Sequence, residues 1–253
     1  MGWLGGPLGD YLLRGFAPSE ASSLHPGDPH SGLRPADTLA ARFGPDFPGA
    51  VAARTVIDFG SGTGADAVEI ARMGAARVIG VEIRAELRAQ AAERAERAGC
   101  GDRCIFVERP AEPTDVVISN DAFEHFDDPA GVLRDMAGLI GPDGKVFVAF
   151  GPPWLHPRGG HLFSAFPWAH LIFTEACLIR WRARFRKDGA RRFAEVPGGL
   201  NQMTVARFER LVAQSPLRIA RLETIPIRGL RLLTLWPLRE FGTSRVRALL
   251  VPR

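Results

Sequence analysis

The chain has 253 residues and a net charge of +4, and 46% of its residues are hydrophobic. With a mean hydropathy of −0.01, it can bury a sizeable core, which excludes a globally disordered protein and favours one α/β domain with an elaboration. Its three cysteines (Cys100, Cys104 and Cys177) are odd in number and form no C-x-x-C pair. We therefore expect a reducing, cytoplasmic compartment, no disulfide framework and no metal site.

Residues 1–50 are rich in Gly, Pro and Ser, and we expect them to form an arm with short helices near 8–15 and 36–43. The start of the chain lacks the basic residues and the long apolar run of a signal peptide. The stretch 162–179 carries no Lys or Arg, but its proline, histidine and glutamate make it a poor membrane span. The main domain is expected at 51–253.

From residue 54 onward, short β-branched runs alternate with helix-forming segments. We expect strands at 55–59, 77–82, 104–107, 115–119 and 145–150, helices at 65–73, 85–98 and 129–140, and a turn at 141–144. This alternation predicts an α/β fold with a doubly wound, mostly parallel sheet and helices on both faces. Ligands of such sheets bind beyond the carboxyl ends of the strands, so residues 60–64, Glu82 and Asn120 should converge on one crevice.

Residues 152–200 interrupt this pattern with glycine, proline, aromatic and arginine-rich stretches. We interpret them as an insertion after the fifth strand that caps the crevice. Regular structure resumes with a helix expected at 205–214 and two last strands expected at 218–225 and 245–251.

A glycine-rich loop, Gly60-Ser61-Gly62-Thr63-Gly64, follows the first expected strand. Glycines allow a sharp turn and a close approach of a ligand to the main chain, and the next helix presents free N–H groups at its start. The loop also fits the G-x-G-x-x-G/A pattern of dinucleotide binders. Asp58, two residues before the first glycine, favours a methyl donor instead, because it can fix the turn and accept hydrogen bonds from an amino-acid moiety.

A second acid, Glu82, ends the second expected strand, 18 residues after Gly64. An acid at this position can accept hydrogen bonds from both hydroxyls of a ribose. The neighbouring Ile83 can pack on the face of an adenine. Together, the glycine loop and the two acids predict a site for a nucleoside-containing ligand.

The segments 56–64, 78–82 and 115–125 resemble the class I S-adenosylmethionine-dependent methyltransferases over about residues 54 to 150, with weaker support from 200–253. The resemblance implies a seven-stranded Rossmann-like sheet whose last strand runs antiparallel. It also implies that S-adenosylmethionine is the cofactor. The donor would be held by Gly60, Ser61, Gly62 and Gly64 of the loop, by Glu82 and by Asn120.

The chain departs from that family after the third expected strand, where members usually carry an acid that binds the adenine amino group. Here Pro110 stands in its place in a short loop. Glu108 or Glu112 would substitute for the acid, and the backbone N–H of Ala111 is another candidate contact.

Several residues are candidates for the acceptor side of the crevice. Asp121 follows Asn120 near the reaction centre, and His125 lies close behind it. A histidine would serve as a base if the acceptor is a hydroxyl; otherwise His125 bonds a nearby loop. His161, which follows two glycines in the insertion, is the second candidate base. His161 and Trp154 are both expected to face the crevice.

A basic patch lies between residues 180 and 192, where one acid, Asp188, stands among seven cations. These are Arg180, Arg182, Arg184, Arg186, Lys187, Arg191 and Arg192. The patch is either a solvated helix face or a contact with an anionic surface, and its interleaved aromatic residues also suit nucleic acid, which we do not favour. The leading hypothesis is methyl transfer to oxygen or nitrogen of a metabolite, natural product or glycan. The rivals are a membrane- or nucleic-acid-associated binding protein and an NAD-dependent oxidoreductase.

Overall fold

The computed structural model describes residues 2–16, 38–196, 199–227, 232 and 238–253. Seven strands form one sheet in the order β3-β2-β1-β4-β5-β7-β6. They are β1 Thr55–Phe59, β2 Arg77–Val81, β3 Cys104–Val107, β4 Thr114–Asn120, β5 Ile140–Phe150, β6 Leu217–Pro226 and β7 Thr243–Pro252. The first five run parallel, and β7 is antiparallel to both β5 and β6. The doubly wound, mostly parallel seven-stranded sheet expected from the sequence is confirmed.

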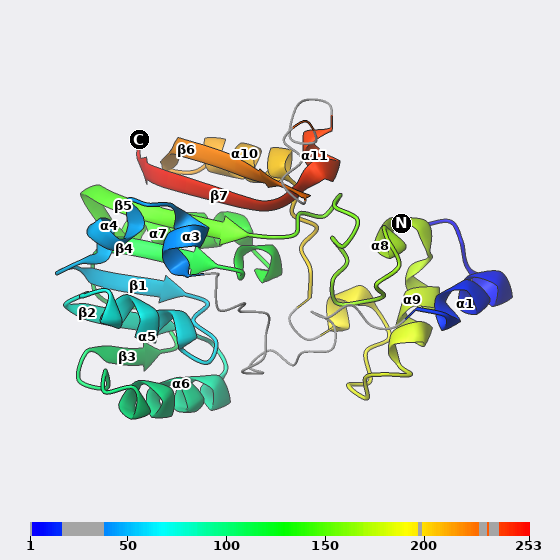
Figure 1. The fold of residues 1–253 in the computed structure, drawn as a ribbon, viewed down its shortest axis with the longest axis horizontal. Helices are drawn as coiled ribbons and strands as arrows, with labels where there is room; N and C mark the ends of the chain where they lie inside the picture. The colour runs from blue at the N-terminus through cyan, green and yellow to red at the C-terminus, as the bar shows by residue number, and fades with distance from the viewer. Residues whose placement is uncertain (1, 17–37, 197–198, 228–231, 233–237) are drawn as a thin grey trace.

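Helices cover both faces of the sheet (Figure 1). On one face lie α3 Leu39–Phe43, α4 Phe47–Val51, α5 Ala65–Arg72 and α6 Ala85–Arg97, and on the other lie α7 Pro129–Leu139 and α10 Val205–Ala213. Local sequence sets where α7 and α10 begin. The side chain of Asp128 accepts from the N–H of Gly131, and that of Thr204 accepts from the N–H of Arg207, so each helix has an N-cap that satisfies one of its free donors.

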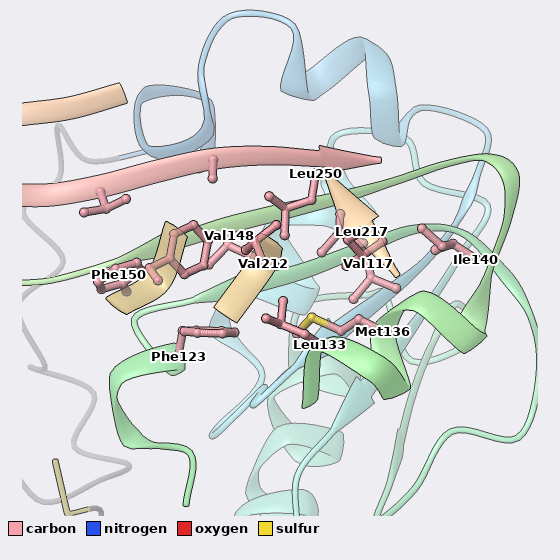
Figure 2. Close-up of a cluster of buried hydrophobic side chains, with 14 of the residues drawn as sticks. Val117, Phe123, Leu133, Met136, Ile140, Val148, Phe150, Val212, Leu217 and Leu250 are labelled. Atoms are coloured by element: carbon pink, nitrogen blue, oxygen red, sulfur yellow. The ribbon is translucent and has the colours of Figure 1, made fainter. Parts of the chain in front are cut away.

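The core consists of one apolar layer on each side of the sheet. Figure 2 shows the layer in which Met136 of α7 and Val212 of α10 pack against strand side chains such as Val117. The next residue along β4, Ile118, belongs to the opposite layer under α5. This alternation follows from the two-residue period of a strand, and it leaves the strand ends free to carry polar groups.

Strand β5 corrects the expectation of a turn at 141–144 followed by a strand from 145. The strand begins at Ile140, which pairs with Thr114, whereas Val116 pairs with Lys145. Residues 141–144 therefore form an irregularity within the strand, in which 141–143 are exposed and Gly144 is buried. The physical reason is that the chain resumes pairing with the same neighbour after these four residues, so no turn to another element is made.

A second lobe lies beyond the carboxyl ends of the parallel strands (Figure 1). It contains α8 Ala169–Ile172 and α9 Glu175–Arg182 of the insertion, joined by α1 Gly6–Arg14. Leu4 forms a bridge with Phe173, and the indole N–H of Trp181 donates to the carbonyl oxygen of Leu13 over 2.9 Å. These contacts give the lobe its own small apolar core.

The first 50 residues thus contribute to two places, not to one arm. Residues 2–16 dock on the second lobe, whereas α3 and α4 pack on the sheet. The helix expected at 36–43 begins at Leu39 after the N-cap Thr38, and residues 17–37 lie outside the described part of the chain.

The remaining short elements are η1 Phe123–His125, η2 Phe193–Glu195 and α11 Arg239–Gly242. Among the described residues, the link between β3 and β4 (108–113) holds no helix. No helix in the described part of the chain combines the length and the apolarity needed to cross a membrane.

Candidate active site

The glycine loop lies between β1 and α5, at the carboxyl edge of the sheet. Gly60, Gly62 and Gly64 all have positive φ, at 87°, 51° and 76°. A Cβ at Gly60 would stand 2.7 Å from the Cβ of Ala122, and one at Gly64 would stand 2.8 Å from the Cβ of Ala91, whereas one at Gly62 would meet nothing within 4 Å. Gly60 and Gly64 therefore permit close packing, and Gly62 presents its backbone on an open side where a ligand can approach.

Two buried oxygens beside this loop have no hydrogen-bond partner among the described residues: Oδ2 of Asp58 and Oγ of Ser61. Burial, followed by the nearby charges of Asp66 and Glu82, raises the pKa of Asp58 well above its ordinary value. Buried polar atoms are costly when unsatisfied. The loop thus holds acceptor capacity that suits a donor-bearing or cationic ligand.

Asp66, in the first turn of α5, was not predicted as a site residue. Burial raises its pKa to about 6, and the amide nitrogen of Asn120 counters this by donating to Asp66 Oδ2 over 2.7 Å. This bond joins the end of β4 to the start of α5. An acid in the first turn of a helix that follows a glycine loop is the sequence signal that would have identified Asp66.

Glu82 lies directly after β2 and is 5% exposed. Arg84 donates to both of its carboxylate oxygens, from Nε to Oε1 and from Nη2 to Oε2, each over 2.9 Å. Burial alone would raise the pKa of Glu82, but these bonds outweigh it and hold the pKa below its ordinary value. The carboxylate is therefore ionised. Its Oε1 also accepts from the backbone N–H of Arg84 over 3.0 Å, so a ligand hydroxyl would have to share this carboxylate with Arg84. Arg84 was not predicted as a site residue.

The side chain of Ile83 is 78% exposed, next to Glu82. An exposed isoleucine at this edge offers an apolar surface that an adenine ring would cover. Glu108, directly after β3, lies on the same edge, 3.9 Å from Arg88 of α6. Arg88 also donates to the carbonyl oxygen of Ile83 over 2.9 Å.

Glu112 and Ala111 are the other candidates for the adenine contact. Glu112 pairs over 2.7 Å with Arg77, which begins β2 at the opposite edge of the sheet. Ala111 is exposed in the link that crosses toward that edge. Of the two acids, Glu108 is therefore the one that lies on the ligand edge.

Asn120 ends β4 and Asp121 follows it. Two arginines that were not predicted as site residues contact this strand end. The Asp121 carboxylate pairs with Arg42 of α3 and, over 2.7 Å, with Arg245 of β7. Arg42 also donates to the amide oxygen of Asn120 over 3.3 Å. Asp121 adopts a positive φ of 48°, a conformation that few non-glycine residues hold without support. Its carboxylate serves here as an anchor for the strand end.

His125 and His161 come together although they are 36 positions apart in the sequence. Their rings lie at right angles with centroids 5.3 Å apart. Nδ1 of His125 lies 2.8 Å from the carbonyl oxygen of Gly199. Burial, followed by the charge of His125, lowers the pKa of His161 to about 3. His161 is therefore a neutral imidazole near pH 7 and a weak base.

Glu124 lies close to both of these histidines. It is 3% exposed, and its Oε1 accepts from the N–H of Gly151 over 3.1 Å. Burial raises its pKa above the ordinary value. Trp154, the other residue expected to face the crevice, packs edge-on against His170 with ring centroids 4.4 Å apart. That contact lies within the insertion.

Comparisons with known proteins agree with this geometry. A family model described as a methyltransferase domain matches residues 31–193. Ribosomal protein L11 methyltransferase from Aeromonas hydrophila subsp. hydrophila is 37% identical over 101 residues, which cover 38% of this chain and 32% of that protein. Ubiquinone biosynthesis O-methyltransferase from Neisseria meningitidis serogroup C is 38% identical over 103 residues, covering 38% of this chain and 43% of that protein. The match thus spans less than half the length of these curated relatives.

A solved structure, geranyl diphosphate methyltransferase in complex with S-adenosylmethionine, superposes over most of both chains. The TM-score is 0.58 at 16% sequence identity, and the alignment covers 94% of this chain and 97% of that one. At this level of identity the likeness concerns the fold. It extends over the second lobe as well as the sheet, since so little of either chain is left out.

Proposed function

The chain belongs to the methyltransferase-domain family, and from this premise we propose that it transfers the methyl group of S-adenosylmethionine to an oxygen or nitrogen of a small-molecule acceptor. The single observation that carries the proposal is the crevice itself. An open glycine backbone at Gly62 lies beside three acids, Asp58, Asp66 and Glu82, and the pKa values of Asp58 and Asp66 are raised.

The charge of this crevice discriminates between the donor and its rival, a nicotinamide dinucleotide. S-adenosylmethionine carries an ammonium and a sulfonium, which would stabilise the ionised forms of Asp58 and Asp66. A dinucleotide would bring two phosphate charges to the same loop, where the acids repel them. The electrostatics therefore support the methyl donor and speak against the oxidoreductase.

We assign the donor's parts to residues as follows. The main chain of Gly60, Ser61, Gly62 and Gly64, with Asp58 and Asn120, would hold the amino-acid end. Glu82 would accept from the ribose hydroxyls, and Ile83 would cover one face of the adenine. Glu108 suits the adenine amino group better than Ala111, because it stays on the ligand edge. The protein's contribution to the in-line displacement would be positioning and exclusion of water.

For the acceptor, we propose that residues 152–200 form a cap on the domain 51–253 and supply its pocket. The lobe lies beyond the carboxyl ends of the strands (Figure 1), and it brings His161 to His125. The aromatic content of this segment suits an apolar or ring-shaped metabolite, natural product or glycan. Two of the similar proteins are named for small molecules, ubiquinone and geranyl diphosphate, and one for a protein.

A transfer assay tests this proposal. The chain would be incubated with S-adenosylmethionine carrying a labelled methyl group and with a cell extract separated into small-molecule and protein fractions. We expect label in the small-molecule fraction and none without the chain. Label only in protein would overturn the acceptor class, and no label in any fraction would count against the activity. The three buried cysteines, none of them in a disulfide, support the proposed reducing, cytoplasmic compartment.

A second candidate role, docking on an anionic membrane surface, is favoured by a specific feature of α1. Trp3, Leu8 and Tyr11 are 79%, 59% and 70% exposed, while Leu13 on the other side of α1 is buried. This face adjoins the basic patch, because Asp10 pairs with Arg180 over 3.0 Å. Exposed aromatic residues beside arginines suit a membrane interface with anionic lipid.

Vesicle flotation tests the docking. Vesicles containing phosphatidylglycerol should retain the chain at low salt, and pure phosphatidylcholine should not. The charge reversal Arg184→Glu should weaken retention, whereas Arg97→Glu on α6, also an exposed arginine, should not. Equal binding to both vesicles, or retention by RNA alone, would contradict the proposal.

A further inference from the structure

Three potential metal ligands from two distant segments meet at the border between the sheet and the second lobe. Glu124 and His125 lie in η1, just after β4, and His161 lies in the insertion. One ligand atom from each residue lies within 4.8 Å of the others. Two imidazoles and one carboxylate are a donor set typical of zinc and of other divalent transition metals.

The carboxylate of Glu124 supplies an independent observation. The residue is 3% exposed, and its Oε1 accepts from the N–H of Gly151. Its Oε2 is buried and has no hydrogen-bond partner among the described residues. A buried carboxylate oxygen is costly unless it is paired, bonded to a donor or coordinated to a metal. A cation shared with the two histidines would compensate it.

The histidine rings are oriented as metal ligands usually are. Nδ1 of His125 lies 2.8 Å from the carbonyl oxygen of Gly199, so that nitrogen carries the proton and Nε2 keeps its lone pair. His161 has a hydrogen bond with the Gly159 backbone. A backbone carbonyl that fixes the ring through one nitrogen is the common outer support of a ligating histidine.

The segments that carry the ligands are themselves held firmly. The side-chain amide of Asn201 donates to the carbonyl oxygens of Phe123 and Phe126, each over 2.9 Å, which closes η1 around Glu124 and His125. On the other side, Nδ1 of His170 accepts from the N–H of Gly160 over 3.0 Å, next to His161. The ligands are therefore presented from a supported frame.

We propose that Glu124, His125 and His161 bind one divalent transition-metal ion, with Zn²⁺ as the best match to the donor set. In a tetrahedral zinc site, ligand atoms about 2.1 Å from the metal lie roughly 3.4 Å from one another. Small side-chain rotations would close the present separations. Three protein ligands leave a fourth position open. This proposal is opposite to the expectation, drawn from the cysteines, that the chain has no metal site.

The use of that open position rests on the proposed function. The cluster adjoins the glycine loop. Ala122, two residues before Glu124, lies so close to Gly60 that a Cβ at Gly60 would stand 2.7 Å from the Cβ of Ala122. The metal would thus stand beside the donor, toward the lobe assigned to the acceptor. An acceptor oxygen could occupy the open position and be held for attack. The metal would position the acceptor and would not touch the donor's binding loop.

Metal titration of the full chain, made without an affinity tag, tests the site. After treatment with a chelator, the chain would be titrated with Zn²⁺ against a chromophoric competitor, and separately with Co²⁺ followed by visible absorption. We expect one equivalent of metal per chain and a cobalt spectrum of a four-coordinate site. His161→Ala and Glu124→Gln should each weaken Zn²⁺ binding by about 100-fold or more.

The control is His156→Ala, which removes another buried histidine of the same insertion outside the cluster, and it should leave metal affinity unchanged. If a variant of a metal ligand does not fold, the melting temperature of the parent chain still tests the site, and we expect it to rise when Zn²⁺ is added. No stoichiometric uptake, or equal affinity in all variants, would overturn the site. Calorimetry with S-adenosylhomocysteine separates the metal site from the proposed methyltransferase function. If the chain binds S-adenosylhomocysteine but no metal, only the metal site is contradicted.

Discussion

The backbone at Gly62 is the residue-level feature on which donor binding depends most. Its φ is positive and nothing crowds its Cβ position. Gly62→Asp should therefore fold, at a cost of about 1 kcal/mol for the left-handed conformation, yet abolish S-adenosylhomocysteine binding by placing a charged side chain where the ligand approaches. Calorimetry measures the affinity.

Gly99 offers a matched control for this change. It too has a positive φ, 69°, and open space around its Cβ position, but it lies at the end of α6. Gly99→Asp should cost similar stability and leave donor affinity intact. Equal affinity in the two folded variants would show that the loop does not hold the donor.

Glu82 should contribute through charge-assisted hydrogen bonds to the ribose, each worth about 1.5–3 kcal/mol in favourable cases. Because Arg84 already donates to both oxygens, we expect Glu82→Gln to weaken S-adenosylhomocysteine by roughly tenfold, near the lower end of that range. Glu112→Gln removes the charge from a glutamate paired with arginine at the opposite edge and should have no effect. A change below twofold for Glu82→Gln would place the ribose elsewhere.

The raised pKa values of Asp58 and Asp66 predict a pH dependence of donor binding. The pKa of Asp66 is about 6, so the protonated, neutral form of Asp66 predominates as the pH falls below 6. A bound ammonium favours the charged form, and binding must then release protons. Affinity for S-adenosylhomocysteine should rise by about tenfold between pH 5 and pH 7.

Calorimetry in two buffers of different ionisation enthalpy measures this proton release directly. Asp66→Asn should reduce it while keeping an acceptor for the amide of Asn120. Affinity that is constant with pH, with no proton release, would mean that the acids do not face the donor's cationic groups.

At the scale of elements, α3 is the part of the first 50 residues that reaches the site. Its buried Arg42 bridges Asp121 and Asn120 at the end of β4. Arg42→Met should lower the free energy of unfolding by about 1–3 kcal/mol, because one side of a partly buried pair is lost. Thermal or urea unfolding measures this.

Arg54→Met is the comparison for this effect. Arg54 pairs with Asp115, and both side chains are about half exposed, at 59% and 46%, so the change should cost less than about 1 kcal/mol. If both changes lowered the free energy of unfolding by the same amount, α3 would only cover the sheet and would not support the strand end.

The order and bounds of these elements were largely predictable, for reasons visible in single segments. The run 55–59 is apolar, β-branched and followed by glycines, which leaves few alternatives to a buried strand. The irregularity at 141–144 was not predictable, because glycine, proline and aspartate at those positions are equally typical of a turn. Three arginines were not predicted as site residues: Arg42, Arg84 and Arg245. Arg42 and Arg245 contact Asp121, which lies far from both in the sequence. Arg84 contacts Glu82 across a bend in the backbone.

At the scale of the whole molecule, two lobes share one border. The sheet lobe holds the glycine loop and the acids, and the second lobe brings His161 to Glu124 and His125. The sequence predicted an insertion beyond the strand ends, but local patterns could not predict that residues 2–16 would join it. The function follows from this division if one lobe binds the donor and the other the acceptor.

Calorimetric titration of the full chain with S-adenosylhomocysteine, matched by a titration with NAD⁺, tests the central claim most directly. The acidic crevice predicts one S-adenosylhomocysteine per chain with micromolar or tighter affinity, loss of that binding in Gly62→Asp, and no heat with NAD⁺. Binding of NAD⁺ without binding of S-adenosylhomocysteine would contradict the account.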